Sequence, residues 1–411
     1  MIFRHIIAPI LFFTSGTQHL VAQVDSSLFR TATPDTDSNV LNMDAIYTRP
    51  YLVSGNYPVA IGGYLESNWQ HSGTDGVSEG HQFQFRRLTL FFSSTITRRI
   101  RFLTEIEFED GARHIAIEFA ALDFELHPLL NLRGGMILNP IGAFNQNHDG
   151  PKWEFTDRPL ASTELLPATW SNPGFGLYGK WYQGSLMFGY ETYITSGLND
   201  SVISNSQGRT FLPAVKNKPD RFSGNGNGEI LWNGKLACKH NKLGEIGVSA
   251  FTGIYNTWQA GGLQTDFKRR CSAWAIDYNN SIKSWGTRIV GEWVCIRTEI
   301  PESYSQQFGA KQHGGFVDII QPLIKRPFLH WEQAEINLAV RLEYLDYNRD
   351  TFSETAERIH DETSSIVAGL GFRPSTQTIL RLNYRYRLQK DLLGNPPEQS
   401  ATISLGISSY F

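Results

Sequence analysis

Cysteine is scarce in this 411-residue chain, which contains only Cys238, Cys271 and Cys295. An odd and small number of cysteines cannot form a complete disulfide framework, and no C-x-x-C pair suggests a zinc site. Basic residues are not in excess either, because 37 lysines and arginines face 40 acidic residues and the formal net charge is −3. This balance excludes a protein that binds nucleic acid through bulk positive charge.

Long hydrophobic runs are also missing beyond the N-terminus, which excludes ordinary transmembrane helices. A short apolar run at Ile6–Phe13, with basic residues before it and a small residue at Ala22 after it, is typical of a secretory signal peptide. We therefore expect residues 1–22 to direct export. Residues 23–58 are polar and rich in turn-forming residues, and we expect an irregular periplasmic segment there, followed by one β-barrel domain over residues 59–411.

Glycine and aromatic residues are abundant, with 37 Gly, 26 Phe, 16 Tyr and 10 Trp, a composition that favours extended β-structure. In Ile379–Leu388, apolar or tyrosine side chains alternate with arginine and asparagine, and the same period of two runs through Glu335–Tyr344 and Arg101–Phe108. A soluble β-sandwich would bury the apolar face against a second sheet. A membrane barrel places that face in lipid and the charged face in a wet lumen.

The connections distinguish these two architectures. Sixteen strands are expected, beginning near Val59, Phe83, Ile100, His114, Asn131, Gly174, Gly184, Glu229, Gly244, Arg270, Trp285, Gln307, Ala334, Thr363, Thr376 and Gln399. Long connections, which are Gln70–Gln82, Asn139–Pro173, Thr195–Gly228, Tyr255–Arg269 and Asn348–Glu362, alternate mostly with short ones. The pattern predicts an all-β, sixteen-stranded antiparallel transmembrane barrel of the porin type, with short periplasmic turns and long external loops.

The end of the sequence agrees with this prediction. Apolar residues alternate through Ala401–Phe411, and the aromatic pair Tyr410 and Phe411 stands last. This arrangement is similar to the signal read by the bacterial outer-membrane assembly machinery. We expect a protein embedded in outer-membrane lipid, with interfacial aromatics that include Trp153 and Trp170.

Three passages resemble the phosphate-selective porin O and P family: Phe85–Ser94 followed by Arg101–Phe108, Leu132–Gly142, and Phe155–Leu160. The resemblance implies a sixteen-stranded, trimeric diffusion channel for anions such as phosphate. It also implies a basic residue before the proline that opens the third external loop. Met136–Asn139, the corresponding stretch here, contains no lysine or arginine, which argues against phosphate as the solute.

Asn139–Pro173 is the expected constriction loop, because a sixteen-stranded barrel is too wide to select solutes without a loop folded inward. Its expected charged residues at the constriction are Lys152, Arg158, Asp149, Glu154 and Asp157. Together with Glu164 the loop has four acidic and two basic residues, so it lacks the excess of cations that a phosphate filter needs. The other long loop, Thr195–Gly228, is rich in Asn, Ser and Gly and is expected to be exposed.

Charged residues in the alternating strands are expected to face the lumen, because an arginine at mid-bilayer on the lipid face costs about 2–4 kcal/mol. The predicted pore-lining basic residues are Arg87, Arg101, Arg133, Arg341, Arg381, Arg385 and Arg387. The predicted pore-lining acidic residues are Glu105, Glu107, Glu118, Glu335 and Glu343. Salt bridges within the barrel wall are the alternative role for both sets.

The function predicted from the sequence is passive diffusion of small hydrophilic solutes or ions through a homotrimeric outer-membrane porin, without catalytic residues, metal or cofactor. Two alternatives stay open. One is a closed structural or adhesive barrel whose third loop plugs the lumen. The other is an outer-membrane hydrolase, for which Gly76-Val-Ser-Glu-Gly80 matches G-x-S-x-G but lies outside the strand–turn–helix context that such a motif requires.

Overall fold

A computed structural model describes residues 40–52, 59–218, 221–224 and 226–411 of the chain. The predicted signal peptide at residues 1–22 lies outside the described residues.

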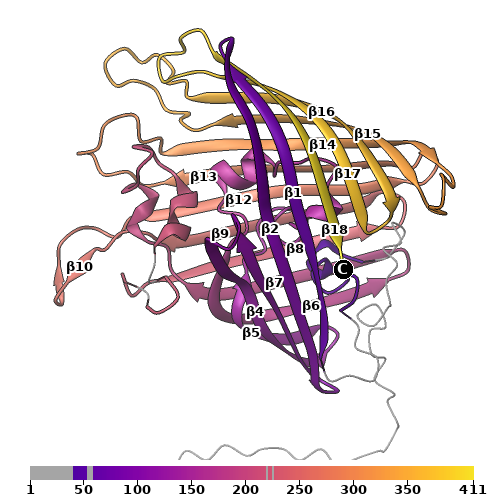
Figure 1. Cartoon of the computed structure of the whole chain (residues 1–411). Coiled ribbons are helices and arrows are strands. Elements are labelled where there is room, and N and C mark those ends of the chain that lie inside the picture. Colours follow the sequence, from indigo (N-terminus) through magenta and orange to yellow (C-terminus); the bar gives the residue numbers. More distant parts are fainter. Residues whose placement is uncertain (1–39, 53–58, 219–220, 225) are drawn as a thin grey trace, which may run out of the picture.

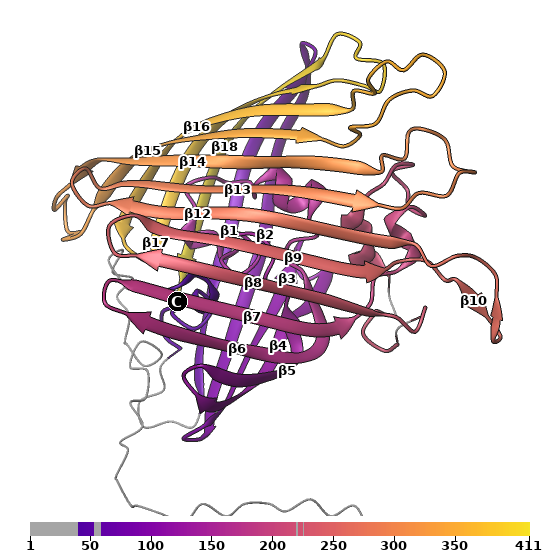
Figure 2. The ribbon, with the colours of Figure 1, turned by 180° about the vertical axis from the view of Figure 1, so that it is seen from behind.

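Within the described residues, sixteen antiparallel strands close into one barrel, which confirms the predicted fold class. Figures 1 and 2 show the barrel from opposite sides, with the strands inclined to one another around a common interior. The strands are β1 (Ala60–Thr74), β2 (Val77–Thr97), β3 (Ile100–Glu109), β4 (His114–His127), β5 (Leu130–Leu138), β6 (Ser171–Gln183), β7 (Leu186–Ser196), β8 (Ile230–His240), β9 (Gly244–Ile254), β12 (Arg270–Ile282), β13 (Thr287–Thr298), β14 (Lys311–Lys325), β15 (Glu335–Asp346), β16 (Glu362–Ser375), β17 (Thr378–Gln389) and β18 (Glu398–Tyr410).

Neighbouring strands in the barrel are neighbours along the chain, and β1 pairs with β18 to close it. The closing register places Tyr64 opposite Tyr410 and Thr74 opposite Ser400. Closure satisfies the backbone hydrogen-bonding groups of both edge strands, which an open sheet in lipid would leave unpaired. The remaining strand pair, β10 (Gln259–Ala260) with β11 (Leu263–Gln264), forms a small hairpin that projects beyond the barrel (Figure 2).

Within the described residues, short helical turns occur before β1, as η2 (Asn42–Asp44), and in the connections between strands, as η3 (Gly150–Lys152), η4 (Ala161–Leu165), η5 (Asp200–Val202) and η6 (Leu212–Asn217). No helix in the described part of the chain is long and apolar enough to cross a membrane.

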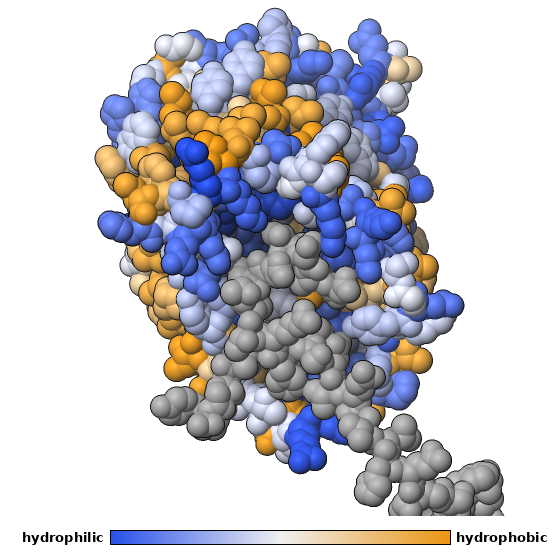
Figure 3. Space-filling view, turned by 90° about the vertical axis from the view of Figure 1, so that its right-hand side faces the viewer, coloured by the Kyte–Doolittle hydropathy of each residue, from blue (hydrophilic) through white to orange (hydrophobic). Residues whose placement is uncertain are grey.

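The two faces of the strands differ as the alternation predicts. On β17 and β18, the cross-strand partners Leu382 and Leu405 are 47% and 50% exposed on the outside, whereas Arg381, next to Leu382 on β17, is 1% exposed on the inside. Figure 3 views the end where the short turns lie, and there hydrophilic residues are frequent toward the middle of the visible surface while hydrophobic residues lie mostly toward the flanks. The outer surface therefore suits a hydrocarbon environment.

The prediction of a long loop at Gln70–Gln82 is wrong. β1 and β2 continue through this polar stretch to a tight turn at Asp75 and Gly76, which both have positive φ. The polar residues concealed the strands because this hairpin lies at an end of the barrel, where side chains on either face can be hydrophilic. Strand length is set here by backbone pairing and by the turn rather than by apolar alternation.

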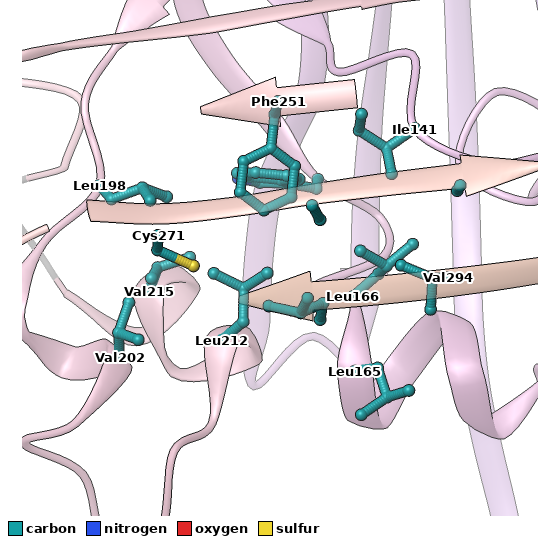
Figure 4. Packing of buried hydrophobic residues seen from close by; sticks show 14 of the residues in the cluster. Ile141, Leu165, Leu166, Leu198, Val202, Leu212, Val215, Phe251, Cys271 and Val294 are labelled. Carbon is teal, nitrogen blue, oxygen red and sulfur yellow. The ribbon is translucent and has the colours of Figure 1, made fainter. Parts of the chain in front are cut away.

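The expectation that Thr195–Gly228 is exposed is also wrong. Val202, Leu212 and Val215 of this loop are buried and pack against Leu165 and Phe251 in the largest hydrophobic cluster (Figure 4). The cluster joins two external loops to the inner face of β8, β9, β12 and β13. The loop folds inward because burial against the inner face of the barrel removes its apolar residues, which are spaced among asparagines and serines, from water.

Two tryptophans expected at the membrane interface face inward instead, as does Tyr410 of the expected assembly signal. Trp153 and Trp170 are 8% and 2% exposed, within the loop inside the barrel, and Tyr410 is 7% exposed with its hydroxyl donating to Asp149 Oδ2 at 2.7 Å. Phe411, in contrast, is 51% exposed, and its ring packs against Gly63, which has no side chain in the way.

Replacing Leu382 with arginine tests the outward orientation of the strands. We expect Leu382→Arg to lower the free energy of unfolding in lipid by about 2–4 kcal/mol, because the guanidinium enters hydrocarbon. Chemical unfolding of the protein in lipid vesicles measures this. Leu263→Arg is the control, since Leu263 is 73% exposed in the projecting hairpin. Equal stability of the two variants would contradict a lipid-facing Leu382.

Candidate functional site: the lumen and its internal loop

The loop between β5 and β6, residues 139–170, lies inside the barrel along most of its length. Its first part is held by β8, β9 and β13. The Asn139 amide oxygen accepts from the Asn233 amide at 2.9 Å, and the Gly142 carbonyl accepts from Lys235 Nζ at 2.7 Å. On β13, the buried Glu292 carboxylate accepts hydrogen bonds from the backbone N–H groups of residues 143 and 144 at 2.8 and 3.2 Å.

Four residues later the loop reaches the opposite side of the lumen. His148 Nε2 lies 3.3 Å from Glu105 Oε1 on β3, and β3 and β13 are halfway around the barrel from each other. The next residues contact β17 and β18, where the Gly150 carbonyl accepts from Arg381 Nη1 at 3.0 Å. The loop therefore crosses the lumen rather than following one side of it.

The segment after the crossing runs along β13 and β15–β18. Glu154 accepts from Arg288 on β13 and Arg373 on β16 at 2.7 and 2.8 Å. Phe155 packs into an apolar pocket of the barrel wall, and the Thr156 hydroxyl donates to the Asn383 amide oxygen at 2.7 Å. These contacts hold this part of the loop directly against the wall.

Asp157 and Arg158 follow in this segment and bear partly exposed charges. Asp157 pairs with Arg86 of β2 at 2.5 Å, and its side chain is 29% exposed. Arg385 Nη2 lies 3.9 Å from the same carboxylate. Arg158 Nη2 lies 3.8 Å from Glu107 on β3, and the Arg158 side chain is 19% exposed. Opposite charges therefore alternate around this part of the lumen.

All seven predicted basic residues face the lumen, and most of them are buried in ion pairs. Arg87 lies 3.1 Å from Glu66 and 3.0 Å from Glu107. The other buried pairs are Arg133 with Asp123 at 2.7 Å, Arg341 with Asp318 at 2.7 Å, and Arg381 with Glu66 at 2.5 Å, and Arg101 forms a half-buried pair with Glu125. Arg101, Arg385 and Arg387 are the half-buried members. Arg385 lies near Asp157 and Glu343, at 3.9 and 3.6 Å, whereas Arg387 donates to the amide oxygen of Gln389 at 2.7 Å.

The predicted acidic residues occupy several environments. Glu105 and Glu107 are buried on β3, and Glu343 accepts from the backbone N–H of Leu160 at 2.8 Å. Glu118 is the extra residue of a bulge in β4 and is 9% exposed. Glu335 lies at the short-turn end of β15, where it is 3.8 Å from Lys325 and distant from the loop.

Four arginines that hold the interior were missed. Arg49, Arg288 and Arg373 lie outside the stretches of clear alternation. Arg86 was missed for a different reason: the bulge between Glu66 and Ser67 in the β1–β2 register turns it inward beside Arg87. Strict alternation would have placed two consecutive arginines on opposite faces, so the bulge conceals one of them.

The ion pairs shift the titration of the loop carboxylates. Burial alone would raise the pKa of Glu154, but Arg373 and Arg288 lower it from 4.5 to about 2. Burial acts in the same direction on Asp157, and Arg86 with Arg385 brings its pKa below the ordinary value. Burial would lower the pKa of His148, but Glu105 raises it. At neutral pH the loop is therefore held by ionised carboxylates.

Glu105, His148 and Asp149 place three metal-binding groups within 4.8 Å of one another. The guanidinium of Arg49 already pairs with both carboxylates, at 2.8 Å from Glu105 and 2.5 Å from Asp149. A cation is thus supplied by the chain itself, and these residues form an ion-pair cluster rather than an open metal site.

Comparison of the sequence with known proteins gives a partial match. No family model matches the chain. An uncharacterized protein of Aquifex aeolicus (strain VF5) is 34% identical over 147 residues, which is 34% of this chain and 32% of that protein. The chain thus matches about a third of the length of this curated relative.

Several solved structures have the same fold. The outer membrane channel DcaP of Acinetobacter baumannii gives a TM-score of 0.52 at 11% identity, over 86% of this chain and 97% of that one. The trimer form of OmpT, an outer membrane protein of Vibrio cholerae, gives 0.51 at 9% identity, over 86% and 99%. The anion-selective porin from Comamonas acidovorans gives 0.50 at 12% identity, over 86% and 99%. The chain thus has the fold of sixteen-stranded outer-membrane porins.

Glu154→Gln tests whether the ion pairs of Glu154 with the barrel wall stabilise the protein. A carboxyl whose pKa falls from 4.5 to about 2 on folding contributes on the order of 3 kcal/mol above pH 4.5, and this contribution disappears as the pH falls toward 2. We expect the wild type to be more stable than the variant at pH 7, with a difference that shrinks below pH 4.5. Thermal unfolding in detergent across this pH range measures it.

Glu354→Gln is the matched control, because Glu354 lies in the exposed connection between β15 and β16. It should change the unfolding temperature little at any pH. A difference between the wild type and Glu154→Gln that stays constant with pH would contradict the ion-pair role of Glu154.

Proposed function

We propose that this protein is an outer-membrane porin through which small hydrophilic solutes or ions diffuse passively, in the form of a homotrimer. The observation that carries the proposal is a closed barrel with an apolar exterior, whose charged interior keeps partly exposed guanidinium and carboxylate groups beside an inward-folded loop. Fixed charges of both signs next to water are the means by which wide barrels select small solutes.

The hydrogen-bonding state of these groups supports a wet passage. Among the described residues, Arg158 Nη2, Arg385 Nε, Arg387 Nε and Glu107 Oε2 are shielded from bulk solvent but have no hydrogen-bond partner in the protein. Buried polar groups of this kind are normally satisfied by water or by a ligand. We infer that solutes pass between Asp157–Arg158 of the loop and the wall formed by β2, β3 and β17.

The solute class follows from the charges along this path. Arg86, Arg158, Arg385 and Arg387 lie along it, but Asp157, Glu107 and Glu343 neutralise several of them. Such a mixed lining favours small polar or zwitterionic solutes and simple ions over phosphate as a dedicated substrate. The resemblance to phosphate-selective porins therefore stays a prediction about the family, and trimer formation rests on the porin fold.

A closed structural or adhesive barrel is the second candidate. The observation that favours it is the crossing of the lumen by the internal loop, from Glu292 on β13 to Glu105 on β3. A hydrolase has less support, because Gly76-Val-Ser-Glu-Gly80 lies in the β1–β2 hairpin and Ser78 Oγ accepts from the N–H of Gly80. A nucleophile elbow needs a strand followed by a helix.

Recording of single-channel currents in planar bilayers tests the proposal. We expect stepwise conductance, and Arg387→Glu should shift the reversal potential in a salt gradient toward cation selectivity, because it replaces a partly exposed lumenal cation with an anion. Arg297→Glu makes the same charge change on the outer face of β13 and should leave the potential unchanged. Absence of any conductance would favour the closed barrel, and conductance without a shift would remove Arg387 from the path.

A further inference from the structure

Residues 40–52 lie inside the barrel, although the sequence predicted a periplasmic segment for 23–58. Leu41 and Met43 are 1% and 5% exposed and pack against residues of β6–β8. Ile46 and Leu52, at the other end of the segment, pack against the inner face of β1–β4. Figures 1 and 2 show this indigo segment within the outline of the barrel, near the C-terminus. The segment therefore reaches across part of the lumen.

Polar contacts anchor the segment along its length. The Asp44 carboxylate lies 2.5 Å from Lys180 Nζ on β6, and the backbone N–H of Asn42 donates to Glu245 on β9 at 2.9 Å. The Tyr47 hydroxyl donates to Asp123 on β4 at 2.7 Å. The segment therefore has a defined binding position, with charged partners on three separate strands. Such partners are required because buried charges are tolerated only when they are paired.

Arg49 makes the most elaborate of these contacts. Its Nε and Nη2 donate to the two oxygens of Asp149 at 2.9 and 2.5 Å, and Nη2 also donates to Glu105 at 2.8 Å. Its guanidinium carbon lies 4.0 Å from the ring centroid of Phe91. The Arg49 side chain has no exposed surface. Two carboxylates, one of them bound in a bidentate manner, and an aromatic face match a planar cation better than an ammonium.

The partners of Arg49 come from two different elements. Glu105 belongs to the barrel wall, whereas Asp149 belongs to the internal loop and is itself held by the Tyr410 hydroxyl of β18. One side chain thus ties the segment, the loop and the wall together. Removing it would leave two carboxylates in a buried site with less positive charge to balance them, so the closed arrangement would lose stability.

We propose that residues 40–52 are a plug that holds the channel closed, and that Glu105, Asp149 and Phe91 form a guanidinium-binding site that latches the plug through Arg49. This proposal rests on the proposed porin function. It assigns to the lumen a binding site for a planar cation, filled by the protein's own arginine.

Single-channel recording with chemical rescue tests the proposal. In the wild type we expect long closed periods, and in Arg49→Ala an open fraction at least about tenfold larger, because the closed state loses its latch. Guanidinium ion added at millimolar concentration should return Arg49→Ala toward the closed behaviour, whereas methylammonium, which lacks the planar fork, should not. Arg297→Ala also removes an arginine, but from the outer face of β13, away from the plug and the internal loop, and should keep the wild-type open fraction.

A second variant keeps the test decisive if Arg49→Ala assembles poorly. Arg49→Gln combined with Glu105→Gln removes one buried charge of each sign. It should be open like Arg49→Ala but insensitive to guanidinium, and heat-dependent gel mobility checks its folding. If the wild type and the Arg49 variants conduct alike, the pore stands and the plug is overturned. If every variant and the wild type are silent, the porin function itself fails.

Discussion

Charges buried inside this barrel must be paired, and the rest of the interior follows from that constraint. The apolar phase of each strand sends guanidinium and carboxylate groups inward, where they are removed from bulk water by the loop and the segment between them. Pairs such as Arg341 with Asp318 and Arg381 with Glu66 therefore form within the wall or toward the loop. Pairing gives the interior a defined geometry, because each charge has one satisfactory position for its partner.

Two kinds of contact position the internal loop: ion pairs with the barrel wall in one part and hydrophobic packing in another. Leu165 and its neighbours join the cluster that also contains residues of the 197–229 connection, while Glu154 and Asp157 are bound by arginines of β2, β13 and β16. An apolar side and a charged side thus divide the lumen. Solutes would meet the charged side, because the apolar side is filled by side chains.

The same logic connects the proposed pore to the proposed plug. Asp149 is a loop residue that accepts hydrogen bonds from both Arg49 and Tyr410, so the position of the loop and that of the segment depend on one carboxylate. A channel narrowed by a rigid loop needs only a small additional element to close. Residues 40–52, the proposed plug, carry charges that pair with both the wall and the loop.

Much of the architecture was predictable from local patterns. The period of two in Ile379–Leu388 placed Leu382 outside and Arg381 inside, and the alternation of long and short connections predicted sixteen strands close to their observed positions. The bulges that reorient Arg86 and carry Glu118 were not predictable, because a single inserted residue leaves no mark in composition. The inward fold of residues 197–229 was missed for a related reason, since its few apolar residues acquire meaning only beside partners from other strands.

The sequence by itself determined the class of structure, because strand periodicity and turn spacing are local properties that survive without tertiary contacts. Only the tertiary structure decided what fills the barrel. The meeting of Arg49, Glu105 and Asp149 joins residues about 50 and 100 positions apart along the chain, and Tyr410 completes it from the last strand. Such a cluster is created by closure of the barrel around its contents, and no pattern along the chain encodes it.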